Sequence, residues 1–453
     1  MNDAPFLQGL IEYGEIGCRA SLSAGADQAE AFVQNSRVIE VEVEAGSLRC
    51  CDAKEDPGLC VRAFRGGGVG FSRVSRIAEE EVKAAGVEAA GMARHAQPDP
   101  DFRTLPPPMK HVEVAGLYDR EIADLKHRTA IQWAEEIIEA GKETAPDAII
   151  RAGVRLAAGS ACVVNSLGAA AEERFTSAHV YVFAVIRRNG SAASFYDFSR
   201  ARSLGGVESR AELARRTVRR ALSYLDSRKI RSGAYTVVLG PLASAELFEE
   251  LCGAASAENV QRKRSYLVGK KGKKIAADTL SIADDGTVPG GIGSSPFDGE
   301  GVPHRRFVFV DGGTLAGFFH NSYTSGKSGE PNTAHASRGG YHSSVGIGHT
   351  NIRASTGART EKEIISPLNE AIYIESSSLS PNPATGDFSA TVDYGWKIEK
   401  GELAYPVANT MIGGNVLDVI AGIEEISKDY RDDAGNVFPS LLIGRLNVAG
   451  AGG

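Results

Sequence analysis

The sequence has little of several features that mark particular classes of protein. It contains no apolar run long enough to cross a membrane, and its start, MNDAPFLQGL, lacks the basic and apolar segments of a secretory signal. The net charge is −7, which gives no general attraction to nucleic acid or anionic lipid. Only six cysteines occur, none in a C-x-x-C pair. We therefore expect reduced thiols and a cytosolic, cytoplasmic protein with no membrane partner.

The remaining composition is that of an ordinary globular protein, with 42% hydrophobic and 24% charged residues. A single hydrophobic core stops growing at roughly 250–300 residues, so 453 residues predict more than one domain. Five prolines between residues 98 and 108 mark a boundary or linker. We expect an N-terminal domain at 1–105, a middle segment at 106–230 and a C-terminal domain at 231–453.

Hydrophobic periodicity predicts an α+β fold, with an N-terminal α/β region and a larger, β-rich C-terminal domain. Helices are expected at residues 6–23, 77–93, 118–143, 208–225, 242–255 and 415–427. Strands are expected at residues 38–44, 58–64, 69–74, 148–157, 162–166, 178–187, 235–239, 306–310, 371–375, 388–399 and 440–448. The helix at 208–225 is strongly basic, but acidic residues interrupt it, which favours a solvated or interface face over nucleic-acid binding.

Glycine-rich segments do not complete a nucleotide-binding motif. The run Gly66–Gly70 lacks the G-x-G-x-x-G spacing and joins two expected strands. The segment Gly326-Lys327-Ser328 resembles the end of a phosphate loop, but Asn321 occupies the required first glycine. No G-x-S-x-G occurs, so a nucleophile elbow is not supported either.

Three histidines, His335, His342 and His349, are spaced by seven residues. The four glycines between them make a helix improbable, and the segment has no carboxylate or cysteine to complete a usual ligand set. The favoured interpretation is an ordinary loop, with a metal-binding loop as the alternative. The pair Asp284-Asp285 precedes Gly286 and is most simply part of a turn.

The densest positive patch runs from Arg262 to Lys274. Its pattern predicts two short strands joined by a turn at residues 269–272. A solvated hairpin is favoured because the whole chain is acidic, and attraction of a phosphate is the alternative.

Several segments resemble the TldD/PmbA family, also called modulators of DNA gyrase. The most specific lie in the last half of the chain: GAYTVVLGP (233–241), SSPFDGEG (294–301), TGDFS (385–389), GWKIEKGE (395–402), IGGN (412–415) and PSLLIGRLNVAG (439–450). The first stretch agrees, with GLCVR (58–62) followed by VGFS (69–72). Each motif is short, but their order and spacing together cover nearly the whole chain.

The resemblance implies two kinds of subunit. The TldD kind carries H-E-x-x-x-H on the helix after the V-V-L strand and a cysteine near the C-terminus, which together hold a catalytic zinc. In this sequence the same helix reads EELCGA, with Glu249 and Ala254 at the histidine positions and only Glu250 and the following glycine, Gly253, retained. The cysteine position falls near Arg431, and no cysteine follows Cys252. The chain therefore resembles the PmbA/TldE branch, without a metal site or catalytic set of its own.

The resemblance thus predicts a non-catalytic subunit of a metallopeptidase complex, with zinc only in a TldD-like partner subunit. Peptide substrate, a homodimer when the chain is alone, and a cleft that includes Asp298, Glu300, Gly301 and Asn415 are further expectations. Asn415 also fits the N-cap of a helix. Two alternatives remain open: a peptidase active alone with an unusual metal site that uses Glu249, Cys252 and a distant histidine (His320 or one of the loop histidines), or a regulator that binds gyrase or nucleic acid.

Overall fold

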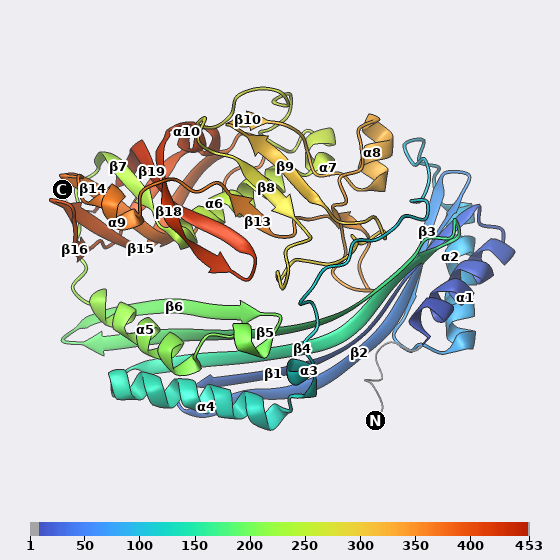
Figure 1. The fold of residues 1–453 in the computed structure, drawn as a ribbon, viewed down its shortest axis with the longest axis horizontal. Helices are drawn as coiled ribbons and strands as arrows, with labels where there is room; N and C mark the ends of the chain where they lie inside the picture. Colours follow the sequence, from blue (N-terminus) through green and yellow to red (C-terminus); the bar gives the residue numbers. More distant parts are fainter. Residues whose placement is uncertain (1–8, 452–453) are drawn as a thin grey trace.

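The computed structural model describes residues 9–451 and contains two large sheets (Figure 1). One sheet has six strands in the order β3-β2-β1-β4-β5-β6, and every neighbouring pair is antiparallel. It therefore combines strands from both sides of the proline-rich segment. Its strands are β1 (Gln28–Glu44), β2 (Ser47–Arg65), β3 (Gly68–Val74), β4 (Ile149–Asn165), β5 (Ala170–Arg188) and β6 (Ser191–Ala201).

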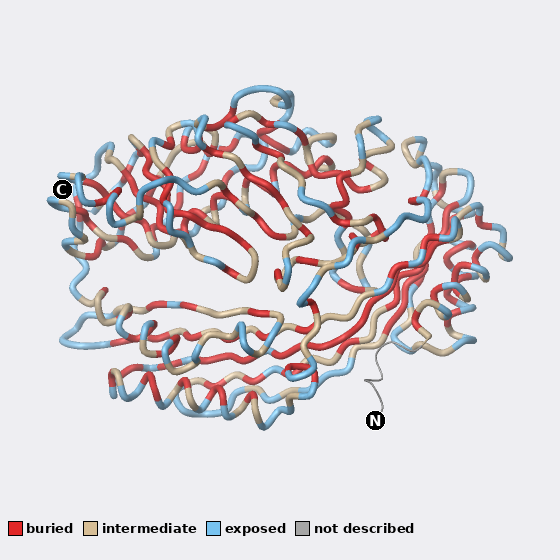
Figure 2. Tube along the Cα trace, in the orientation of Figure 1, coloured by how far each residue is buried: buried red, intermediate tan, exposed pale blue. Residues whose placement is uncertain are grey.

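Helices cover one face of this long, curved sheet (Figure 1). The helices α1 (Leu10–Ser23) and α2 (Glu79–His95) pack at one end of the sheet. The helices α4 (His127–Thr144) and α5 (Arg210–Ser223) pack at the other end. The short helices α3 (Arg120–Asp124) and η1 (Leu204–Gly206) lie in the connections. The C-terminal domain lies over the opposite, concave face, so buried residues continue from the sheet into that domain (Figure 2).

Small residues in β4 allow the concave face to carry aromatic rings. A Cβ at Gly153 would lie 2.0 Å from the ring of Tyr181, and one at Gly159 would lie 2.9 Å from the ring of Phe175. Glycine at these positions leaves the space that the rings on the neighbouring strand occupy.

The C-terminal domain is built around a closed ring of five strands. The pairings run β19-β17-β15-β14-β7, and β7 pairs again with β19. Closure leaves little exposed edge in this part of the sheet. The strands are β7 (Gly233–Leu239), β14 (Glu370–Ser377), β15 (Asp387–Glu399), β17 (Met411–Asn415) and β19 (Asn436–Ala449).

Further strands extend or flank this ring. Four continue the sheet from β19: β13 (Ile352–Ala354), β8 (Ile282–Asp285), β9 (Arg306–Asp311) and β10 (Thr314–Leu315). Two pair beside it, β16 (Glu402–Pro406) and β18 (Ile423–Asp433), and β11 (Ala336–Ser337) pairs only with β12 (Gly346–Ile347). The helices are α6 (Pro241–Ala254), α7 (Ala257–Gln261), α8 (Ser322–Ser328), α9 (Glu361–Ile365) and α10 (Val416–Ala421). A large core that includes Phe248, Phe309 and Phe438 fills the domain.

The predicted α+β class is confirmed, as are the expected helices that became α1, α2, α5 and α6. Residues 6–8 of the first expected helix lie outside the described residues. No helix within residues 9–451 is long and apolar enough to cross a membrane.

Four expected elements, two helices and two strands, differ in extent or type from the structure. The helix expected at 118–143 is broken into α3 and α4, because Leu125 has an extended backbone and Arg37 donates to its carbonyl oxygen. The helix expected at 415–427 ends at Ala421, and the residues after Gly422 form β18, which pairs with β19 instead. The two strands expected at 148–157 and 162–166 are one strand, β4, because β1 and β5 pair with it on both sides.

Candidate functional site

Helix α6 lies at the centre of the site. Pro241 occupies its first turn, where proline's missing N–H costs no hydrogen bond. Leu251 and Cys252 face the core of the C-terminal domain. Glu249 is exposed on the other side, and among the described residues it has no hydrogen bond or ion pair. The helix therefore presents an unpaired carboxylate away from the core.

A cavity of about 660 Å³, here called the α6 cavity, lies between this side of α6 and the concave face of the six-stranded sheet. Glu246 and Glu249 line it from α6. The rings of Phe183, Tyr196 and Phe198 line it from β5 and β6. Its wall is thus partly aromatic and partly acidic.

Arg431 of β18 also lines the α6 cavity. One guanidinium nitrogen, Nη1, donates to Asp197 Oδ1 at 3.0 Å, and Nη2 donates to the carbonyl oxygen of Phe198 at 2.9 Å. The arginine is therefore fixed by two contacts to β6. Two of the positions that the family resemblance gives to zinc ligands, 249 and 431, meet in one cavity despite their distance in sequence.

The residues at these positions do not fit a zinc ion. Ala254, at the end of α6, has no ligating atom, and the cation of Arg431 would repel a metal ion. Cys252 is buried in the core, and burial, followed by the charge of Asp284, raises the pKa of its thiol well above the ordinary range. Glu250 is half-buried, and burial and Glu249 raise its pKa. Within residues 9–451 no group of three or more His, Cys, Asp or Glu side chains could hold a metal ion.

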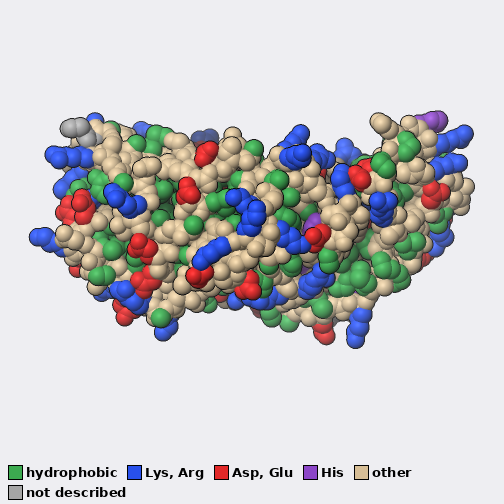
Figure 3. Space-filling model, turned by 90° about the horizontal axis from the view of Figure 1, so that it is seen from above, with side chains coloured by type: hydrophobic (Ala, Val, Ile, Leu, Met, Phe, Trp, Pro, Cys, Tyr) green, Lys and Arg blue, Asp and Glu red, His purple; other side chains and the backbone are tan. Residues whose placement is uncertain are grey.

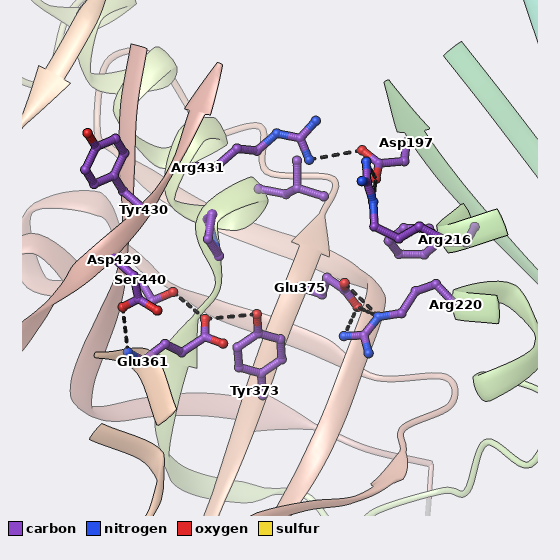
Figure 4. Close-up of a pocket in the computed structure, with 13 residues that line it drawn as sticks. Asp197, Arg216, Arg220, Glu361, Tyr373, Glu375, Asp429, Tyr430, Arg431 and Ser440 are labelled. Atoms are coloured by element: carbon purple, nitrogen blue, oxygen red, sulfur yellow. Dashed lines mark hydrogen bonds and ion pairs between the residues drawn. The ribbon is translucent and has the colours of Figure 1, made fainter. Parts of the chain in front are cut away.

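A neighbouring cavity of about 500 Å³ shares Arg431 and contains an ordered network of charges (Figure 4). Arg220 of α5 donates from Nε to both carboxylate oxygens of Glu375, each at 2.8 Å. Arg216 donates from Nε to Asp197 Oδ2 at 2.9 Å. The basic face of α5 therefore lies at an interface between the six-stranded sheet and the C-terminal domain. The sequence had favoured a solvated or interface face for this helix over nucleic-acid binding.

Glu361 lies in the same cavity, where Tyr373 and Ser440 both donate hydroxyl hydrogen bonds to its Oε2 (Figure 4). Burial raises the pKa of this carboxyl, although the two hydroxyl groups act in the opposite direction. The carboxyl groups of Asp197, Glu361 and Glu375 in this cavity thus all have hydrogen-bond partners within the chain.

The motif at 298–301 lies elsewhere, against the N-terminal sheet. Asp298 is buried and accepts from the backbone N–H groups of Glu300, Val302 and Ala336 at 2.9–3.0 Å. Gly301 has φ +80°, a conformation that favours glycine. These contacts fix the shape of the loop, and a role for Asp298 and Gly301 in a substrate cleft stays a prediction.

Glu300 belongs to a buried cluster that joins the six-stranded sheet to loops of the C-terminal domain, here called the arginine clamp. Arg62 of β2 lies 2.9 Å from Glu300 Oε1 and 3.1 Å from Glu30 Oε1. Arg338 contacts Glu30 from the other side and donates to the carbonyl oxygen of Gly299. Burial alone would raise the pKa of Glu300, but the charge of Arg62 outweighs it and holds the pKa below its ordinary value.

Asn415 caps α10, which is the structural role that the sequence allowed. Its Oδ1 accepts from Leu417 N at 3.0 Å, and its Nδ2 donates to Thr385 O and Asp387 Oδ1 at 2.8 and 2.9 Å. Every polar atom of the side chain is therefore used locally. Its predicted role in the substrate cleft stays a prediction.

The histidine segment, residues 335–349, is not helical, as the glycines indicated, and consists of a loop between the short paired strands β11 and β12. His335 is buried, and its Nε2 lies 3.1 Å from Asp284 Oδ2. Asp284 also accepts from the backbone and hydroxyl groups of Thr350, both at 2.6 Å. Asp284 is therefore a buried acceptor within β8, and the predicted turn begins after Asp285, whose Oδ1 accepts from Thr287 N at 2.9 Å.

The basic segment at 262–274 contains turns, so the expected pair of strands was wrong. Tyr266 and Leu267 are buried in the core, which draws the segment inward instead of leaving a free hairpin. Lys271 pairs with Glu330 and Lys274 with Asp278. In Figure 3, basic side chains on the face seen from above lie among acidic ones and form no single field.

Sequence reasoning missed the residues of β6 that line the two cavities. Tyr196 and Arg200 line the α6 cavity, and Asp197 lines the neighbouring one. The segment SFYDFSR does alternate, with Phe195 and Asp197 buried and Tyr196 exposed. This period of two is in the burial and not in the hydrophobicity, so the available signal was the aromatic content of the segment next to the expected strand at 178–187.

Three domain models of one family match this chain in order. They are PmbA/TldA metallopeptidase domain 1 at residues 29–93, the central domain at 120–225 and the C-terminal domain at 232–450. A Methanocaldococcus jannaschii protein of uncharacterized function is 28% identical over 91% of this chain and 92% of its own length. Metalloprotease PmbA of Escherichia coli O157:H7 is 24% identical over 94% of this chain and 93% of its own.

The fold is similar to that of solved structures. TldE from Thermococcus kodakarensis superposes with a TM-score of 0.88 and 24% sequence identity, over 97% of this chain and 100% of that one. The likeness therefore extends to the arrangement of both sheets.

Proposed function

Because the chain belongs to the PmbA/TldD metallopeptidase family, we propose that it is a non-catalytic subunit that pairs with a TldD-like zinc peptidase. In this complex it would hold peptides or unfolded segments for cleavage by the partner. One observation supports the proposal above all others: the cavity at helix α6 contains Glu249 and Arg431, at the positions where the family resemblance implies a histidine and a cysteine in the zinc-binding kind of subunit.

Arg431 bears directly on this interpretation. Its guanidinium group is a cation, and Asp197 holds it at the cavity wall. A zinc ion at this place would meet a fixed positive charge and would have no ligand from Ala254. Catalysis by this chain alone would require a different set of ligands.

Peptide binding has support from the shape of the same region. Strand β6 ends the six-stranded sheet and pairs only with β5 among the described strands. An extended peptide can be held at such an edge by backbone hydrogen bonds, with little need for side-chain chemistry. The α6 cavity would then accept one of its side chains.

The first test is the zinc content of the purified chain, measured by elemental analysis without added metal. We expect zinc well below one ion per chain. Zinc near one per chain, lost together with peptidase activity in Glu250→Ala, would contradict the proposal and favour a peptidase active by itself.

The second test is reconstitution with a TldD-like chain that carries the complete zinc motif. We expect the two chains to co-purify and to cleave an unfolded peptide together, with no cleavage by this chain alone. The Glu250→Ala variant of this chain should support cleavage as well as the unchanged chain. When the partner is absent, native mass spectrometry should show this chain as a homodimer. If the two chains never associate when mixed, the proposed pairing is overturned.

A further inference from the structure

The α6 cavity has more acidic groups than its own cations neutralise. Arg200 and Arg431 line the cavity, but Arg200 is paired with Asp433 and Arg431 with Asp197. Glu249 remains without an ion-pair partner among the described residues. The cavity therefore offers an unused negative charge.

Two more carboxylates add to this charge. Asp393 is exposed and accepts only from the Ser378 hydroxyl, at 2.8 Å. Glu246 accepts from Ser376 and Ser377. Neither has an ion-pair partner within residues 9–451, and both line the cavity together with Glu249. The cavity thus favours a cation over an anion or a neutral group.

Aromatic rings line the same space. Along β6 the side chains alternate, so Phe195 is buried in the core while Tyr196 is 39% exposed on the concave face. The Tyr196 ring lies 6.0 Å from that of Phe198 and 5.9 Å from that of Tyr181, centroid to centroid. Tyr394 contributes a further ring from β15. Ring faces attract ammonium and guanidinium groups, and their apolar surface also suits the methylene stem of a basic side chain.

We propose that the α6 cavity binds a lysine or arginine side chain of the peptide, with Glu249 and Asp393 facing its charge and the Tyr196 ring against its stem. This inference rests on the proposed peptide-holding function and gives it a substrate class, peptides with basic residues. In zinc-binding relatives the same place would hold a metal cation, whereas in this chain the cation would belong to the substrate.

The test uses three labelled unfolded peptides that differ at one central position, which is lysine, norleucine or glutamate. Fluorescence anisotropy measures their affinity for the full chain, alone and with the TldD-like partner. We expect the lysine peptide to bind about fivefold more tightly than the norleucine peptide, and the glutamate peptide to bind most weakly. The preference should shrink as ionic strength rises from about 0.05 M to about 0.5 M, because exposed charges are screened.

Variants of single residues test whether the preference for the lysine peptide arises in the α6 cavity. Glu249→Gln should remove most of the preference for lysine, whereas Glu139→Gln should leave it unchanged, because Glu139 is an exposed carboxylate on α4, on the other side of the sheet. Tyr196→Phe should retain the preference, since the ring is kept, and Tyr196→Ala should reduce it. Unfolding curves of each variant check that the fold is intact.

The two proposals fail in different ways. Equal affinity for all three peptides, or a lysine preference that survives Glu249→Gln, would overturn the basic-side-chain site and leave peptide holding intact. Failure of all three peptides to bind, with and without the partner, would overturn the proposed function and this inference with it.

Discussion

The arginine clamp and the α6 cavity both place carboxylates where the six-stranded sheet meets the C-terminal domain, but they do so in opposite ways. In the clamp, Glu30 and Glu300 are buried and face Arg62 at 2.9–3.1 Å. In the cavity, Glu249 is exposed and unpaired among the described residues. A buried carboxylate needs a partner to be tolerated, whereas an exposed one is free to meet a ligand. The clamp therefore serves the fold, and the cavity is the better candidate for binding.

The strongest test of this contrast is removal of the clamp's central cation. Arg62→Ala should lower the free energy of unfolding by about 3–5 kcal/mol, because two buried carboxylates lose their shared partner. Arg19→Ala, which breaks an exposed pair with Glu15, should cost less than about 0.5 kcal/mol. Chemical denaturation measures both, and similar costs for the two variants would remove the distinction.

Adjacent residues of β6 test the two faces of the sheet beneath the α6 cavity. Phe195→Ala should cost about 3–5 kcal/mol, because Phe195 is 3% exposed within the core. Tyr196→Ala should cost less than about 1 kcal/mol, because its ring faces the cavity. A large loss of stability for Tyr196→Ala would show that this ring is a core residue and would weaken its assignment to a ligand.

The region around the arginine clamp, where His304 and Arg338 line one cavity, should also lose more stability in acid than the α6 cavity does. Burial, followed by the charge of His335, lowers the pKa of His304 from 6.5 to about 4. Its neutral form therefore contributes stability that is present above pH 6.5 and is lost as the pH falls through about 4. Between pH 7 and pH 5 this group should cost about 2 kcal/mol.

The measurement is the free energy of unfolding across this range. His304→Asn should show a flatter dependence on pH, whatever its stability at pH 7. Asp284 and Asp285 also face this histidine. Both are unchanged in the His304→Asn variant, so a difference between the variant and the original chain reports on His304. An identical pH dependence of the two proteins would contradict the assignment to His304.

The smallest expected effect is at the cavity itself. Glu249→Gln should change the free energy of unfolding by less than about 0.5 kcal/mol, because the side chain is exposed and has no partner to lose. Thermal or chemical denaturation checks this value. A loss above about 1 kcal/mol would indicate a structural contact of Glu249 and would bring the cavity closer to the clamp in character.

Much of the local structure could be predicted from the sequence, and the failures have physical causes. Alternation in 38–44 and the apolar run at 235–239 correctly predicted strands, because each pattern matches the faces that the sheet buries. Strand β6 was missed, since its exposed face is as aromatic as its buried one. The residues after Gly422 were expected to be helical, but pairing with β19 made them a strand.

The sequence by itself determined that the motif H-E-x-x-x-H is absent from this chain and that no cysteine follows Cys252, because both are read directly from the order of the residues. It also determined the class of fold, since hydrophobic periodicity is a local property. Only the tertiary structure decided which acidic residues are paired and which are free. Glu300 is buried because its loop packs on Arg62, and Glu249 lines the same cavity as Arg431 because β18 returns beside α6. Such neighbours are set by the path of the chain through space, which no local pattern specifies.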